Sequence, residues 1–209
     1  MLTPAQMLAG YGQGIFPMAE SRSDSQLHWV DPRRRGIIPL DRFHISSSLR
    51  RRILRGTFTI TTDSAMQDVV IACADRDETW INAPLASLYG QLFRAGHAHS
   101  LEVWEGQDLV GGVFGVTLGT AFFGESMFSR RRDASKVALA FLVERLRRNG
   151  FTLFDTQFLT PHLESLGGTE ISRAEYRERL RQALRGAADF ASGACPTPQE
   201  LMQRMTQMS

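Results

Sequence analysis

The stretch SLEVWEGQDLVGGVFGVTLGTAFFGESM, residues 100–127, decides the fold of this chain. Residues 100–104, 109–117 and 121–127 are either mostly apolar or alternate between apolar and polar, and each run has the length and composition of a β-strand. The intervening segments EGQD and LGT carry turn-forming residues. The stretch therefore predicts three consecutive strands joined by turns.

A helix and a fourth strand follow this stretch. From residue 134 the apolar residues recur at helical spacing, Asp133 is a plausible N-cap, and Gly150 suits the C-terminal end. Residues 151–158 read as a strand. The order strand, strand, strand, helix, strand predicts a mixed sheet with helices packed against it, an α+β (mixed α/β) fold.

Helices and one strand are also expected around this centre. Upstream, the patterns predict helices at 4–11, from Ser46 or Ser47 to Leu54, at 65–74 and at 84–95, with a strand at 57–62. Downstream, capping boxes begin helices at 172–175 and 197–200. The first residues are rich in Gly, Pro and Arg, so we expect a small N-terminal domain at 1–42 and the main domain at 43–209.

Composition narrows the class of protein. The chain has 209 residues, 43% hydrophobic and 22% charged, which is typical of a globular protein. A net charge of +2 does not by itself suggest a nucleic-acid partner, but the arginines cluster. The two cysteines lack metal-type spacing, which favours free thiols. Residues 1–14 lack the features of a signal peptide, and no apolar run is long enough to span a bilayer, so we expect a cytoplasmic protein without a membrane partner.

Five motifs occur in order along the chain: YGQGIFP at 11–17, HAHSLEVW at 97–104, GESMFS at 124–129, ASK at 134–136 and DTQ at 155–157. Over residues 8–180 the chain resembles the leucyl/phenylalanyl-tRNA–protein transferases. The resemblance implies a small N-terminal domain before an acetyltransferase-like (GNAT) domain. It also implies transfer of leucine or phenylalanine, with methionine as a further candidate, from aminoacyl-tRNA to proteins beginning with Arg or Lys, which feeds N-end rule degradation. It implies neither cofactor nor metal, and we expect a monomer.

The chain departs from the family pattern in three places. It begins close to the GIFP motif, as a shortened form of the N-terminal domain would. Met18 stands where other members carry Trp, and Thr160 stands where some carry Asn. Because the first two departures fall near the expected aminoacyl-adenosine site, they bear on how that group is held.

Asp155 and Gln157 are the leading catalytic candidates. An aminoacyl ester is already activated, so the reaction needs a neutral amine, a positioned carbonyl and stabilisation of developing charge. Strand alternation places both side chains on one face, which we expect to line a wet cleft. Gln157 can hold the amine or the carbonyl, and Asp155 can orient Gln157; whether Asp155 also takes a proton stays open. The alternative is a strand-end pair that caps a neighbouring loop.

Glu125 is the third catalytic candidate. It lies among Phe122, Phe123 and Phe128, where a carboxylate is costly unless it is paired. We expect it to bind the cationic N-terminus or side chain of the acceptor protein. The alternative is an internal salt bridge to a nearby arginine.

Apolar residues are the candidates for holding the aminoacyl-adenosine. An adaptable pocket for leucine or phenylalanine is predicted from Phe114, Met127 and Phe158, and Ser129 is assigned to substrate binding as well. Trp104 is expected to stack on the terminal adenosine and Trp29 to wall the same cleft. Trp80 is assigned to the core, and His97 and His99 to structural roles.

Basic clusters suit the phosphates of the tRNA acceptor stem. One is Arg50, Arg51 and Arg55, and the other is Arg130 to Arg132 with Lys136. A single run of this kind more often forms a solvent-exposed face of the protein than a phosphate-binding site. A helix beginning near Asp133 could add its N-terminal amides.

Two other functions compete with the transferase. A coenzyme-A-dependent acetyltransferase of the same fold would need glycines at the strand-to-helix junction, where this chain reads SRRRDAS at 129–135. A non-catalytic RNA-binding module would need neither Asp155 nor Gln157 and would carry a larger basic excess. Both are disfavoured relative to the transferase.

Overall fold

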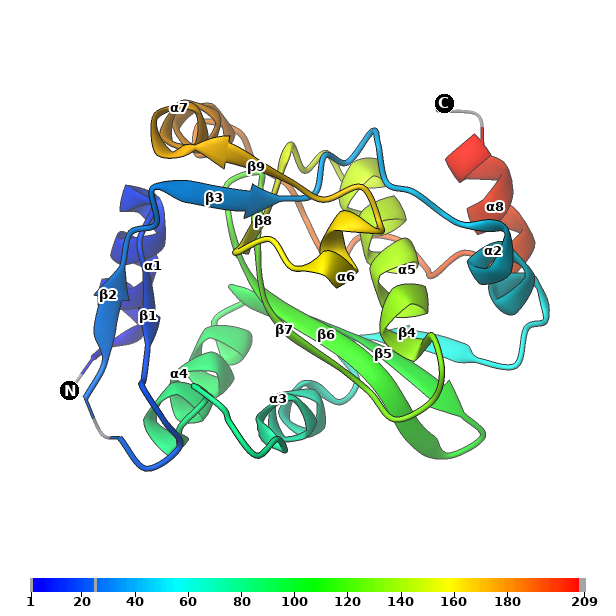
Figure 1. The fold of residues 1–209 in the computed structure, drawn as a ribbon, viewed down its shortest axis with the longest axis horizontal. Helices are drawn as coiled ribbons and strands as arrows, with labels where there is room; N and C mark the ends of the chain where they lie inside the picture. The colour runs from blue at the N-terminus through cyan, green and yellow to red at the C-terminus, as the bar shows by residue number, and fades with distance from the viewer. Residues whose placement is uncertain (1, 25, 207–209) are drawn as a thin grey trace.

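The centre of the fold is a seven-stranded sheet with the strand order β4-β5-β6-β7-β8-β3-β9. A computed structural model of the chain describes residues 2–24 and 26–206. The predicted three-strand stretch forms β5 (Ala98–Glu105), β6 (Asp108–Leu118) and β7 (Ala121–Ser129), each antiparallel to the next (Figure 1). The α+β prediction is therefore confirmed at its centre.

The crossover after β7 produces the one parallel pair among the described strands of this sheet. Helix α5 (Ala134–Arg148) returns the chain to β8 (Leu153–Gln157), which runs parallel to β7. The pairing covers only the register from Ala121 opposite Leu153 to Phe123 opposite Asp155. Beyond that register the two strands part.

The strands at the two edges of the sheet come from distant parts of the chain. One edge is β4 (Thr59–Thr62), which shortens the predicted strand at 57–62. At the other edge, β3 (Arg34–Ile37) lies between β8 and β9 (Thr169–Ser172) and is antiparallel to both. Neither β3 nor β9 was predicted. A side chain at Gly36 would place its Cβ 2.5 Å from the carbonyl carbon of Phe158, so only glycine allows this close approach of β3 to the end of β8.

Helices cover both faces of the sheet (Figure 1). On one face, α3 (Met66–Ala74) and α4 (Ala83–Arg94) pack with α1 (Pro4–Gln13) and α7 (Arg173–Ala183). On the other face, α5 packs with α2 (Ser47–Leu54) and α8 (Pro198–Thr206). Each face encloses its own buried apolar cluster, because successive strand residues point to opposite sides of the sheet. No described helix has the length and apolar character needed to cross a membrane.

The N-terminal residues form a helix and a small separate sheet. The helix α1 confirms the prediction at 4–11, whereas the antiparallel strands β1 (Phe16–Met18) and β2 (His28–Val30) were not predicted. The ring of Trp29 covers Gly10, where a Cβ would lie 2.2 Å from the indole. The domain boundary at residue 42 stays a prediction, and β3, which precedes it, belongs to the large sheet.

Most predicted helix caps are confirmed, and one is not. The hydroxyls of Ser46 and Ser172 accept hydrogen bonds from their own helices, and Thr197 and Glu200 form a reciprocal pair. Asp133 occupies the cap position of α5, but its φ of 64° lies in the left-handed region and its side chain makes no capping bond. A capping side chain bonds its helix from extended backbone. The Asp133 carboxylate instead lies 3.4 Å from Lys136 Nζ.

Candidate active site

A cleft of about 210 Å³ opens where β7 and β8 part. Its walls come from both strands, from β1, from the segment after α3 and from α6 (Pro161–Glu164). The lining residues are Phe16, Met18, Arg76, Trp80, Glu125, Ser126, Met127, Thr156, Gln157, Phe158, Thr160 and Leu163. The cleft therefore contains two of the three predicted catalytic residues, one from each parting strand.

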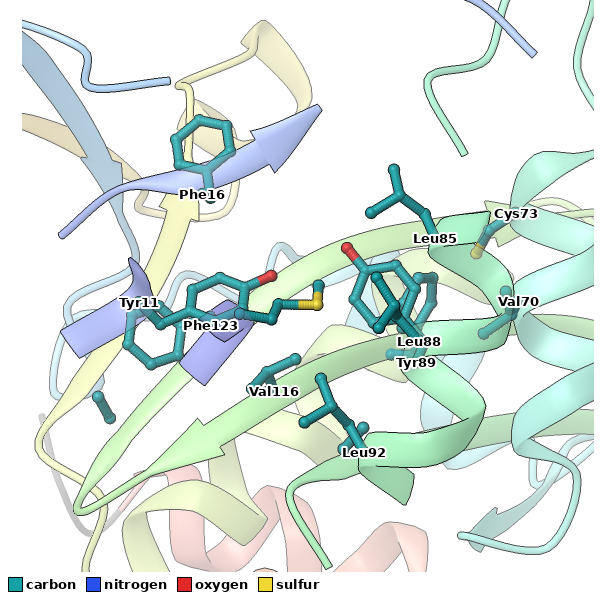
Figure 2. Close-up of a cluster of buried hydrophobic side chains, with 14 of the residues drawn as sticks. Tyr11, Phe16, Val70, Cys73, Leu85, Leu88, Tyr89, Leu92, Val116 and Phe123 are labelled. Atoms are coloured by element: carbon teal, nitrogen blue, oxygen red, sulfur yellow. The ribbon is translucent and has the colours of Figure 1, made fainter. Parts of the chain in front are cut away.

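Glu125 is buried and bound by two tyrosines. Its Oε1 accepts a hydrogen bond from the Tyr11 hydroxyl at 2.7 Å, and its Oε2 accepts one from the Tyr89 hydroxyl at 2.6 Å. Figure 2 shows these two hydroxyls, from α1 and α4, pointing toward one another. Within the described residues no arginine forms an ion pair with Glu125, so the alternative of an internal salt bridge is wrong.

Burial sets the protonation of this cluster. It raises the pKa of Glu125 to about 7, although the hydrogen bonds from Tyr89 and Tyr11 oppose the shift. Burial also raises the pKa of both tyrosines well above 10, so they remain protonated donors. Glu125 can therefore gain or lose a proton near neutral pH.

Aromatic packing holds the two tyrosines in place. The Tyr11 ring lies 4.7 Å from Phe123, and the Tyr89 ring lies 4.9 Å from Phe114 in an edge-on contact. Phe114 is fully buried and does not line the cleft, although the sequence suggested it for the donor pocket. The structure places it behind Tyr89.

Asp155 does not face a wet cleft, and that expectation is wrong. Its side chain is fully buried, and both oxygens bind Arg35, with Nε to Oδ1 at 2.9 Å and Nη2 to Oδ2 at 2.7 Å. The Tyr176 hydroxyl also donates to Oδ2, at 2.6 Å. The reason is topological: Asp155 lies where β8 is still flanked by β7 and β3, so its side chain points into a covered face.

Gln157 lies two residues further on, past the end of the β7 pairing. Its backbone N donates to Asp155 Oδ1 at 2.8 Å, and its φ of 57° lies in the left-handed region. Its Nε2 donates to Glu125 Oε1 at 3.3 Å. Among the described residues no donor hydrogen-bonds to its side-chain oxygen. Asp155 thus fixes Gln157 through the backbone, and the Gln157 amide joins the two strands across the cleft.

The other predicted substrate residues are dispersed. Met127 and the half-exposed Phe158 line the cleft, but Trp104 does not; its indole donates to Thr61 Oγ1 at 2.8 Å on the β5–β4 side of the sheet. Trp29 lines a separate groove of about 1160 Å³ between α1, β2 and α4. Trp80, which the sequence assigned to the core, is half-buried and lines the cleft.

Ser129 and the two histidines lie outside the cleft. The Ser129 hydroxyl donates to the Arg131 carbonyl at 2.9 Å and accepts from the Ser135 amide at 3.2 Å, which ties the end of β7 to the start of α5. His99 Nδ1 lies 2.8 Å from Asp63 Oδ2, and His97 Nδ1 lies 3.4 Å from the carbonyl oxygen of Thr117.

The basic clusters lie close to one another on the surface. Arg51 of α2 and Arg55, which follows α2, line a hollow of about 290 Å³ together with Arg132. Arg50 lines a hollow toward α8. The side chain of Arg130 is half-exposed, and its Nη2 lies 3.8 Å from Asp75. The two clusters therefore meet at Arg132, whereas Arg50 and Arg130 line other hollows.

Sequence reasoning missed five residues of the site and its support. Tyr11 stands within a quoted motif, and Arg35 stands within an arginine run that has the look of a surface charge cluster. Tyr89 and Tyr176 lie on helix faces that look like ordinary core. Nothing in the sequence pointed to Arg76, whose Nη2 hydrogen-bonds the Met127 carbonyl and the Ser126 hydroxyl.

Comparison with solved structures supports the fold alone. A structure titled "Crystal structure of FemX" superposes with a TM-score of 0.52 at 11% identity, covering 68% of this chain and 60% of that one. The two chains thus share a fold over about two-thirds of this chain without close sequence similarity.

Comparison of sequences identifies the family. The family model described as "Leucyl/phenylalanyl-tRNA protein transferase" matches residues 37–181, and the model of the N-terminal domain of these transferases matches residues 1–33. Proteins named leucyl/phenylalanyl-tRNA–protein transferase are similar over the whole chain. One from Cereibacter sphaeroides is 65% identical over 209 residues, covering 100% of this chain and 98% of that protein. Another from Ruegeria pomeroyi is 59% identical, covering 100% and 99%. A third from Paracoccus denitrificans is 56% identical, covering 100% and 98%. The chain therefore belongs to the leucyl/phenylalanyl-tRNA–protein transferase family and is a peptide-bond-forming aminoacyltransferase.

Proposed function

We propose that the cleft between β7 and β8 is the transfer centre. There leucine or phenylalanine, with methionine as a further donor, passes from its tRNA to the N-terminal amine of a protein beginning with Arg or Lys. The observation that carries the proposal is the hydrogen bond between Gln157 and Glu125 across the parting strands, inside the cleft. The parted parallel strands beside a crossover helix also support the acetyltransferase-like (GNAT) assignment.

The reaction is an aminolysis. The acceptor nitrogen attacks the ester carbonyl, a C–N bond forms, the bond from carbonyl carbon to ribose oxygen breaks, and a proton passes from the amine to the ribose oxygen. The free side-chain oxygen of Gln157 accepts an N–H of the attacking amine and so aims its lone pair. Asp155 is already bound by Arg35 and Tyr176, so we assign it a positioning role through the Gln157 backbone rather than proton transfer.

Glu125 receives the cationic acceptor in this proposal. Its charge is stabilised by phenol hydroxyls and not by a resident cation, so the carboxylate remains available to an incoming ammonium or guanidinium group. A cation near a buried carboxyl favours its ionised form. With its pKa near 7, Glu125 can release a proton when a Lys or Arg acceptor binds.

The donor end of the cleft is apolar. Met127 and Phe158 offer an adaptable surface for leucine or phenylalanine. The half-buried Trp80, which lines the cleft as Met18 does, offers a ring face to adenine, the role that the sequence predicted for Trp104. Trp29 and Phe114 take no direct part in this arrangement.

The tRNA body is held by charge. In our proposal, acceptor-stem phosphates bind to Arg50 and Arg51 on α2, to Arg55 directly after it, and to Arg130 and Lys136. Replacing Arg50, Arg51 and Arg55 by Ala should flatten the salt dependence of binding. The slope of log K against log salt concentration should change by about one unit for each phosphate that the variant no longer binds. An unchanged slope would place the tRNA surface elsewhere. Dependence on aminoacyl-tRNA also supports a cytoplasmic location and a place in N-end rule degradation.

The experiment that tests the proposal is Glu125→Gln. With labelled leucyl-tRNA and peptides beginning with Lys, Arg or Ala, the variant should lose its preference for Lys and Arg. Its affinity for a non-hydrolysable leucyl-adenosine analogue should stay near that of the wild type. Ser126→Ala, in the same cleft wall, serves as the control and should keep the acceptor preference. If acceptor use and analogue binding fall together, Glu125 only supports the structure.

A further inference from the structure

A second hollow adjoins the cleft between α3, the end of β7, the start of α5 and α6. Its volume is about 540 Å³, and it shares Arg76, Met127 and Thr160 with the cleft, so the two hollows lie next to one another. In Figure 1, α3 and α6 lie on opposite sides of β7 at this place. The remaining lining residues are Ala72, Asp75, Phe128, Ser129, Arg130, Ser135 and His162.

The walls of this hollow carry more positive than negative charge. Arg76 hydrogen-bonds a carbonyl and a hydroxyl, and neither neutralises its charge. Arg130 lies over the Phe128 ring, with its guanidinium 5.4 Å from the ring centroid, and its Nη2 makes only a loose 3.8 Å contact with Asp75. Two arginines thus stand against one carboxylate in the lining.

His162 supplies a buried hydrogen-bonding atom without a partner. Its Nε2 is inaccessible to solvent and has no hydrogen-bond partner within the described part of the chain. Burial, with the nearby Lys136, lowers the pKa of this imidazole, so it is neutral at pH 7. A neutral imidazole nitrogen can bond a phosphate oxygen or a ribose hydroxyl, according to its tautomer. The amide of Ser135 is already bound to Ser129, so side chains and not the helix terminus make this surface.

We infer that this hollow binds the phosphodiester and ribose that join the terminal adenosine of the tRNA to the nucleotide before it. The inference rests on the proposed function, because it takes the aminoacyl-adenosine to lie in the cleft. The RNA strand must leave that cleft with a negatively charged phosphate. The hollow adjoins the cleft at Arg76, and beyond Arg76 it is lined by Arg130 and His162.

The test compares two non-hydrolysable ligands, 3′-leucylamido-adenosine and the same compound extended by a 5′-linked cytidylyl nucleotide. Wild-type protein should bind the dinucleotide about ten-fold more tightly, the usual gain from a charge-assisted hydrogen bond. Arg130→Gln and His162→Phe should each remove most of this gain and leave the affinity for the mononucleoside unchanged. The matched control is Arg94→Gln on the exposed face of α4, which should keep the full gain. Isothermal titration calorimetry measures all four proteins.

Three results would overturn the inference: equal affinity of the wild type for both ligands, a full gain in both hollow variants, or displacement of the dinucleotide by an equal concentration of inorganic pyrophosphate. The last would assign the hollow to free anions. Because Arg130 is half-exposed, its variant is expected to fold even if His162→Phe does not. Failure of the mononucleoside to bind the wild type would instead count against the cleft itself, so the two proposals fail separately.

Discussion

Two buried carboxylates on neighbouring strands are stabilised in different ways. Asp155 on β8 is fully buried and bound through both oxygens by the guanidinium of Arg35. Glu125 on β7 is 7% exposed and is bound by the uncharged hydroxyls of Tyr11 and Tyr89. One buried charge is thus balanced by an opposite charge, and the other only by dipoles.

The difference separates a fixed group from one that can change its protonation. The ion pair of Asp155 is closed by Tyr176 and by the Gln157 backbone, so it holds the end of β8 in one geometry. Glu125 lacks a resident cation and has a pKa of about 7, so its charge responds to what enters the cleft. We therefore expect changes at the first site to act on stability and changes at the second to act through pH.

Arg35→Met should give the largest effect. It leaves the Asp155 carboxylate buried without its counter-charge, which typically costs about 3–5 kcal/mol in the free energy of unfolding. Urea denaturation measures it. Arg34→Met is the matched control, because Arg34 is exposed and forms a surface ion pair with Glu170 at 3.5 Å. Losing a surface ion pair should cost less than about 1 kcal/mol in the free energy of unfolding. Similar losses in the two variants would show that the Asp155 pair is not a stabilising feature.

The pH dependence of stability should reveal Glu125. Its pKa in the folded protein is raised from 4.5 to about 7, so the folded state holds this proton more tightly than the unfolded state. The resulting stabilisation is complete below about pH 4.5 and is lost as the pH rises through about 7, a change of about 3 kcal/mol. The measurement is the difference in free energy of unfolding between wild type and Glu125→Gln at pH 5 and pH 8. A constant difference would contradict the raised pKa.

Gln157→Ala should reduce transfer about 100-fold, the usual loss when one orienting hydrogen-bonding group is removed from an active site. The fold should survive, since Gln157 lies beyond the pairing with β7. Single-turnover transfer from leucyl-tRNA at saturating acceptor is the assay. Combined with Asp155→Asn, the loss should grow little, because Asp155 acts through Gln157. Losses that multiply would assign the two residues independent roles.

The sequence predicted the centre of the fold well because local patterns decide it. The strands at residues 100–127, the crossover helix and the strand after it follow from period and turn residues, and the structure confirms them. The strands β3 and β9 escaped prediction, since each has only four residues; β3 pairs with β8 and β9, and β9 pairs with β3. Their position depends on tertiary contacts such as the approach of Gly36 to Phe158.

The candidate site was predicted only in part, because it too depends on contacts between residues far apart in the sequence. Motif residues Glu125 and Gln157 do meet in the cleft. The two tyrosines that bind Glu125, however, lie 36 and 114 residues away along the chain. Arg35 looked like one of a run of surface charges, yet it is 1% exposed. Trp104 was placed wrongly beside the cleft because a motif gives order along the chain and not the side of the sheet.

The smallest predicted effect comes from single hydroxyls. Tyr89→Phe removes a hydrogen bond that lowers the pKa of Glu125, so this pKa should rise above 7 by about one further unit. The carboxyl C=O infrared band, assigned by its absence in Glu125→Gln, reports the titration directly. Tyr176→Phe is the matched control: it removes a similar bond from Asp155, which keeps both contacts with Arg35, so the Glu125 titration should stay in place. The pH profile of transfer to Lys and Arg acceptors should move upward in Tyr89→Phe alone. An equal shift in both variants would mean that Glu125 responds to the general polarity of the buried face and not to its own phenol, and the contrast between the two carboxylates would fail.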